Sequence, residues 1–328
     1  MIDKSEAISG GVTKTGKHKR GASDCEIELQ SKLASPVDKV SENPSNQMEL
    51  RSHRARALIG WMTPPEAKLC LTGRRADLEP TAQELAAAER ARRTAAERTQ
   101  KLDQSDLISP IPSELADYAE RVCASNPGKA LVDQGFEIRM VDLSRTCAAQ
   151  PQVHTDHAIE RVSEVDPNDL LAIAGITLPL GTPTALPVFF DPTKNAWLFT
   201  SANPNLRVIG NFSTGLQQGM QGWGFAVGVS TSFVQLASYG GRTLLRDGYH
   251  RAVGLLARGI THVPAFFKEF QSVAELSLPP GLFSHEVYMS AHPPLLPDYL
   301  DDSVAIDTRS PVVQKVVMIQ AIEVTIST

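Results

Sequence analysis

A short segment of the chain combines residues that could bind an anion. Asp247, Gly248, Tyr249, His250 and Arg251 follow one another where an apolar run gives way to a helical pattern. The first N–H groups of a helix have no partners within it, and the helix dipole adds positive potential there. A phosphate would accept hydrogen bonds from these amides, and the Arg251 guanidinium would add a charge-assisted bond. We therefore predict a phosphate-binding turn formed by Gly248, Tyr249, His250 and Arg251.

Two side chains of this turn are candidates for catalysis. Asp247 would repel a bare phosphate, so we expect it to hold a magnesium ion that bridges to the phosphate, or to act as a base. His250 would donate to the phosphate or relay a proton near neutral pH. The alternative is structural: Asp247 caps the helix, Gly248 forms the turn, and His250 and Arg251 are solvated. Spacing alone favours the structural alternative.

The turn must lie between a strand and a helix to bind an anion in this way. Residues 243–246 predict the end of a strand, and Gly259 predicts the end of the helix that follows. A second strand is expected over 260–267, at a sheet edge or with Pro264 early in it. Apolar residues at i, i+3, i+4 and i+7 give the helix one buried face: Tyr249, Ala252, Val253 and Leu256.

The stretch LLRDGYHRAVGLLARGITHVPAF, residues 244–266, resembles the signature of the ParB/sulfiredoxin superfamily. In that family a strand leads into a Gly-x-x-Arg turn, a helix with an alanine, a glycine stop and a strand with Val-Pro. The resemblance implies that the turn binds the phosphates of a nucleotide such as CTP, ATP or ADP, and it shifts the balance away from the structural alternative. The matching residues are Asp247, Gly248, His250, Arg251, Ala252, Gly259, Val263 and Pro264.

The sequence departs from two branches of this superfamily. Sulfiredoxin has its nucleophilic cysteine directly before the His-Arg pair, where this chain has Tyr249, so sulfinic-acid reduction is not expected. No basic helix-turn-helix pattern follows the motif, so a DNA-partitioning role is not expected either. The predicted function is nucleotide binding, with hydrolysis or phosphoryl transfer left open and magnesium as the accompanying ion. The alternatives are a non-catalytic protein-interaction scaffold that keeps the fold, and a ParB-like nuclease.

A second group of polar residues, His154, Asp156 and His157, lies in the segment VHTDHAIE. Imidazole and carboxylate groups are metal ligands, but a site needs a further contributor from elsewhere in the chain. The favoured interpretation is a surface turn that starts a helix at Thr155 or Asp156.

Three regions of different composition follow one another along the chain. The first has few large apolar residues, so a disordered tail is predicted over 1–55. A helical region is predicted over 56–130. Residues 131–328 contain short strand-like and helical pieces, which predicts a mixed α/β (α+β) fold: a ParB/sulfiredoxin-like domain with an insertion at about 165–225.

Two helices are predicted within the helical region. Thr63 is followed by Pro64 and, three residues on, by Glu66, which is a capping pattern for a short helix. Asp77–Asp103 is rich in Ala, Glu and Arg and should be strongly helical. We expect this Ala-rich helix to be a solvated connector, with contact to a protein partner as the alternative.

Composition excludes several classes of protein. The chain is 42% hydrophobic and 21% charged, and it has no apolar run of about 18 residues, so no membrane-spanning helix is expected. Residues 131–328 carry 12 Lys and Arg against 18 Asp and Glu, so binding to DNA is not favoured. The cysteines form no Cys-x-x-Cys pair, which favours a reducing cytoplasm in a bacterial-type protein: Cys25, Cys70, Cys123 and Cys147.

Overall fold

The computed structural model describes residues 52–75, 77–99, 101–181, 185–215, 221–276 and 278–326. These residues belong to one compact unit. The disordered tail predicted over 1–55 lies outside the described residues except at its end, where the prediction is wrong: Ser52–Ala57 forms strand β1. This segment is ordered because Ala55 and Ala57 are buried and β1 pairs on both sides, with β13 (Ile306–Pro311) and β5 (Gln152–His154).

The predicted mixed α/β fold is confirmed, and its largest sheet has six strands in the order β2-β3-β12-β10-β11-β4. β10 and β11 form an antiparallel hairpin, and β12 runs parallel to β10. Pro264 is the third residue of β12, which lies between β3 and β10, so it is early in its strand but not at a sheet edge. The strands are β2 (Ile108–Ser109), β3 (Glu137–Asp142), β4 (Cys147–Ala148), β10 (Gln235–Tyr239), β11 (Arg242–Asp247) and β12 (His262–Glu269).

The helices predicted near the start of the described chain are present. Thr63 and Glu66 form a capping box at the start of α2 (Pro64–Leu71), as the sequence predicts. The Ala-rich segment forms α3 (Ala82–Ala96), shorter than predicted at both ends, and a second capping box starts it at Thr81. Its alanine face is not solvated: the Ala88, Ala91 and Ala95 side chains are buried. The helix packs against the 3-10 helix η1 (Ile59–Trp61). A protein partner for α3 stays a prediction, and it would have to bind the charged face of the helix.

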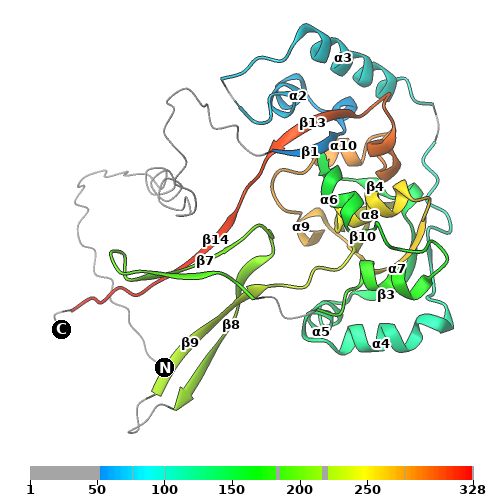
Figure 1. The fold of residues 1–328 in the computed structure, drawn as a ribbon. Helices are drawn as coiled ribbons and strands as arrows, with labels where there is room; N and C mark the ends of the chain where they lie inside the picture. The colour runs from blue at the N-terminus through cyan, green and yellow to red at the C-terminus, as the bar shows by residue number, and fades with distance from the viewer. Residues whose placement is uncertain are drawn as a thin grey trace, which may run out of the picture. The chain divides into compact units, whose positions relative to one another are not determined.

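Two further sheets lie partly in the region predicted as an insertion. One has the order β14-β7-β6, and the other is a two-stranded ribbon of β8 and β9 (Figure 1). Their strands are β6 (Val188–Asp191), β7 (Ala196–Ser201), β8 (Leu206–Gly215), β9 (Gln221–Val229) and β14 (Lys315–Gln320).

Short helices complete the described chain, and none of its helices is long and apolar enough to cross a membrane. They are α4 (Ala116–Ala124), α5 (Asn126–Val132), α6 (Thr155–Glu160), α7 (Leu170–Thr177), α8 (Tyr249–Ala257), α9 (Val273–Leu276), α10 (His285–Tyr288), η2 (Ser113–Leu115), η3 (Leu143–Arg145) and η5 (Leu296–Leu300).

Candidate functional site

The predicted strand, turn and helix around Asp247 are confirmed as β11, Gly248 and α8. Gly248 has φ +96° and begins the helix, and a Cβ at this position would lie 2.8 Å from Val234 Cγ2. Both the left-handed backbone and the close contact therefore require glycine. Asp247 is not the helix cap that the structural alternative expects. Its Oδ1 accepts a hydrogen bond from the Gly248 amide at 2.6 Å, and its Oδ2 accepts one from the Ser232 hydroxyl at 3.1 Å.

The Arg251 side chain points into the protein. Its exposed fraction is 6%, so the solvated arginine of the structural alternative is wrong. One terminal nitrogen donates to the carbonyl oxygens of Ser232 and Ile176 at 2.7 and 3.3 Å, and the other donates to the Ser232 hydroxyl at 2.8 Å. Burial lowers the pKa of Arg251 to about 10. A phosphate at the turn would have to displace Ser232 to reach this guanidinium, and nucleotide binding by Arg251 stays a prediction.

Tyr249 holds the first turn of α8 against a neighbouring loop. Its ring is buried, and its hydroxyl accepts hydrogen bonds from the amides of Ala149 and Gln150 at 2.8 and 3.2 Å. The same hydroxyl donates to the Leu245 carbonyl of β11. Burial raises the pKa of Tyr249 well above its ordinary value. Packing and hydrogen bonds thus occupy the whole Tyr249 side chain. Only the backbone amide of Tyr249 remains for the predicted contact with phosphate.

His250 lies beside other histidines. Its ring centroid is 5.3 Å from that of His154 and 6.2 Å from that of His157. Burial lowers the pKa of His250 to about 3, and the charges of His154 and Arg161 add to the effect. The Nε2 atom is buried and has no hydrogen-bond partner among the described residues. The structure therefore places a neutral imidazole with an unused nitrogen next to a histidine cluster.

The cluster itself is formed by His53, His154 and His157, which come from three different elements. His53 is on β1, His154 ends β5, and His157 lies on α6. One ligand atom from each residue lies within 4.8 Å of those of the other two. The predicted helix start at Thr155 is confirmed by α6, but sequence reasoning missed His53 as the further contributor.

Strand pairing explains how His53 reaches the other two histidines. Ala55 of β1 pairs with His154 of β5, which places residues about 100 positions apart in one sheet. The Nδ1 atom of His53 lies 3.1 Å from Asp156 Oδ2, so a carboxylate orients the ring. With Nδ1 engaged in this way, Nε2 is the nitrogen of His53 that is left to bind a metal.

Three imidazoles are a donor set for zinc and other transition metals. Zinc–nitrogen bonds of about 2.0–2.1 Å place tetrahedral ligands about 3.3 Å apart, so the rings would close by up to about 1.5 Å on binding. His53, His154 and His157 are only partly buried, which leaves room for such rotations. Asp247 is not in this group, which is the one such group among the described residues. Magnesium at Asp247 stays a prediction.

Charged side chains of both signs surround the cluster. Burial, together with the charges of His53 and His157, lowers the pKa of His154; Asp156 opposes this effect, and Arg74 adds a smaller lowering. Arg161 has the same effect on His250. Both arginines are exposed, and neither takes part in an ion pair between described residues. Their guanidinium groups are therefore available to other ligands.

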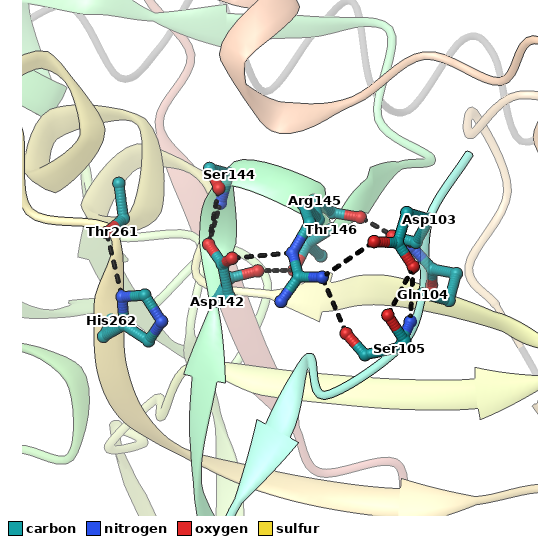
Figure 2. Close-up of polar contacts among 9 residues, drawn as sticks. All are labelled: Asp103, Gln104, Ser105, Asp142, Ser144, Arg145, Thr146, Thr261 and His262. Atoms are coloured by element: carbon teal, nitrogen blue, oxygen red, sulfur yellow. Dashed lines mark hydrogen bonds and ion pairs between the residues drawn. The ribbon is translucent and has the colours of Figure 1, made fainter. Parts of the chain in front are cut away.

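A separate polar cluster around Asp142 and Arg145 serves the fold instead (Figure 2). The Arg145 Nε donates to Asp142 Oδ2 at 2.8 Å, and its Nη1 donates to the Ser105 carbonyl at 2.6 Å. Gln104 donates to the Arg145 carbonyl at 2.8 Å. These groups satisfy one another, and they fasten the segment 103–105 to the end of β3.

Comparisons with known proteins identify no relative of this chain. The chain matches no model of a protein family, no curated protein and no solved structure. The likeness of residues 244–266 to the ParB/sulfiredoxin signature stays a prediction, and the geometry of the site must carry any functional proposal.

Proposed function

We propose that the protein binds a transition-metal ion through His53, His154 and His157 and hydrolyses a phosphate ester there, with nucleotides as the substrate class. The observation that carries the proposal is the approach of three imidazoles from β1, β5 and α6, with their ligand atoms within 4.8 Å. A zinc ion held by three histidines keeps one position for water and lowers the pKa of that water to about 7. The metal ion proposed here differs from the magnesium expected at Asp247.

The residues around the cluster support an anionic substrate. Arg74 and Arg161 are exposed and both lower the pKa of a histidine here, so in this proposal their side chains turn toward the cluster and neutralise phosphate oxygens. The buried Nε2 of His250 has no hydrogen-bond partner among the described residues, so a water or substrate oxygen that reached it would gain a hydrogen bond. The nucleotide as substrate is supported by the resemblance of the adjacent turn to a family that binds nucleotide phosphates.

Metal binding is tested first, on the full-length protein stripped with a chelator. Titration with zinc chloride in a calorimeter should show one ion bound per chain. His154→Ala should weaken binding at least about tenfold. The matched control is His262→Ala, because His262 is an exposed histidine outside the cluster that bonds to Thr261. A wild-type protein that takes up no zinc would overturn the proposal.

Hydrolysis is tested second, by measuring phosphate released from ATP and CTP. Release should require the metal, and it should stop in His154→Ala but not in His262→Ala. Arg161→Ala should raise KM more than it lowers kcat, since Arg161 binds phosphate in this proposal. Zinc binding without phosphate release would overturn hydrolysis and leave a metal-binding protein.

A further inference from the structure

A groove with a basic lining lies between the segment that follows α3, the start of β11 and the segment 291–292. Its volume is about 540 Å³, which is within the range of ligand sites. None of the three clustered histidines lines it. The lining holds no aspartate or glutamate from the described part of the chain, but it holds three strongly basic side chains: Arg98, Lys101 and Arg242. A cavity lined by charges of one sign concentrates ions of the opposite sign.

Arg98 is the one of these three side chains that is already neutralised. Its Nη1 and Nη2 atoms donate to the two carboxylate oxygens of Asp298 at 2.9 and 2.7 Å. Asp301 lies 3.7 Å from Nη2, and the guanidinium lies 4.9 Å from the centroid of the Trp61 ring. These contacts fix Arg98 as part of the wall, so it contributes little net charge to the groove.

Lys101 and Arg242 keep their charges for a ligand. Lys101 is exposed, and neither residue forms an ion pair with a described residue. One terminal nitrogen of Arg242 donates to the Ser290 carbonyl at 2.9 Å. The other guanidinium nitrogens of Arg242 are not among the buried groups without a partner, so they remain accessible. Two positive charges match a phosphate monoester, which carries about −1.5 to −2 at neutral pH, better than a single carboxylate.

Hydrogen bonds hold the walls of the groove in place. The Gln104 side-chain oxygen accepts a bond from the Thr243 amide at 2.7 Å, which fastens the segment after α3 to β11 beside Arg242. Trp61 Nε1 donates to the His292 carbonyl at 2.8 Å, which fixes the segment 291–292. A ligand therefore meets a preformed backbone, and only the ends of the Lys101 and Arg242 side chains must become ordered on binding.

A second cavity adjoins the groove and has a more apolar lining. Its volume is about 340 Å³, and it shares the segment 291–292 with the groove. Trp61, Ala95 and Ala96 line it, and its one arginine, Arg92, already pairs with Glu89 at 2.5 Å. This cavity can take the organic part of a ligand whose anionic group lies in the groove.

We propose that the groove binds a small phosphate monoester, with Lys101 and Arg242 at the phosphate and the organic part beside Trp61. This inference is independent of the metal site.

The test is calorimetric titration of the full-length protein, stripped of metal with a chelator, at low ionic strength. Phenyl phosphate is the probe, and one molecule should bind per chain, more tightly than inorganic phosphate does. Lys101→Ala and Arg242→Ala should each weaken binding at least about tenfold, since hydrogen bonds to charged groups contribute that much. The matched control is Lys129→Ala, because Lys129 is an exposed lysine on α5 that forms no ion pair with a described residue. Circular dichroism establishes that each variant is folded.

Two further variants separate this site from the metal site. His154→Ala and Arg161→Ala should bind phenyl phosphate as wild type does, whatever becomes of zinc binding. Loss of binding in these two variants, with none in Lys101→Ala and Arg242→Ala, would place the anion at the histidine cluster and overturn the proposal.

Other results would also overturn it. A wild-type protein that binds no phenyl phosphate refutes the site. Benzoate that binds as tightly as phenyl phosphate refutes the preference for a doubly charged group. Phenyl phosphate that binds no more tightly than inorganic phosphate refutes the place of the organic part. Binding of a single-stranded oligonucleotide without binding of phenyl phosphate would assign the basic lining to nucleic acid instead.

Discussion

Replacing Gly254 by alanine should separate helices α6 and α8. Gly254 lies in α8, and a Cβ there would lie 2.3 Å from the Ala158 carbonyl oxygen and 3.1 Å from Val162 Cγ2. Ordinary contacts begin near 3.4 Å, so α6 must move by about 1 Å, and the obstructing atom is backbone that cannot rotate away. Overpacking of this kind costs about 1–3 kcal/mol, while alanine gains about 1 kcal/mol in helix propensity. Because backbone must move, we expect a net loss of about 1–2 kcal/mol.

The loss can be measured by urea unfolding and by thermal melting. For a chain of this size, 1 kcal/mol corresponds to about 2–4 °C, so Tm should fall by about 2–8 °C. Gly175→Ala is the matched control, because Gly175 also lies in a helix, α7, and its nearest neighbour is the Tyr118 hydroxyl at 4.0 Å. This control should be stabilised by about 0.5–1 kcal/mol.

The same variant also probes the histidine cluster. α6 carries His157, and a shift of α6 by about 1 Å adds to the distance that the ligand atoms must close on binding, so Gly254→Ala should weaken zinc binding while Gly175→Ala should not. Equal stabilities for the two alanine variants would refute the reasoning about helix packing. A destabilised Gly254→Ala protein that binds zinc as well as wild type would show that zinc binding does not depend on the position of α6.

Three further predictions follow from single side chains. Tyr249→Phe should lower the free energy of unfolding by about 1–3 kcal/mol in urea melts, since the buried Ala149 amide, the partly buried Gln150 amide and the Leu245 carbonyl lose their partner. Burial raises the pKa of Asp142, but hydrogen bonds from its neighbours outweigh this and hold the pKa below its usual range. Asp142→Asn should therefore be less stable than wild type above about pH 4, and urea melts should show the difference fading as pH falls further. Burial raises the pKa of Cys147 to about 12, and mass spectrometry should show iodoacetamide labelling Cys123 before Cys147 in the native protein but equally in urea.

Local patterns in the sequence predict the elements well, because their causes are local. The capping box at Thr63 and the start of α8 after Gly248 depend on residues within one turn. The position of Arg251 depends on more distant residues. Its place in the helical repeat is off the apolar face, which predicts solvation, but α8 packs against α6 and α7. An arginine on a helix covered on several sides finds carbonyl partners instead of water.

The histidine cluster could not be assembled from the sequence for a similar reason. His154 and His157 are three residues apart, and any pattern search finds them together. His53 joins them through the pairing of β1 with β5, and nothing in the sequence of β1 specifies that register. Only the buried alanines on alternate positions, Ala55 and Ala57, show that this segment is a strand with one covered face.

The turn after β11 has separate roles for its side chains. The Tyr249 and Arg251 side chains form hydrogen bonds with backbone groups of neighbouring segments. Asp247 accepts hydrogen bonds from the Ser232 hydroxyl and the Gly248 amide. These residues fix where α8 begins and how it is rotated. That rotation presents His250, which lies one residue away on the helix, to the cluster on α6 and β5. The most prominent residues of the motif thus position α8. The chemistry proposed here depends instead on histidines that the pairing of β1 with β5 brings together and beside which the turn places His250.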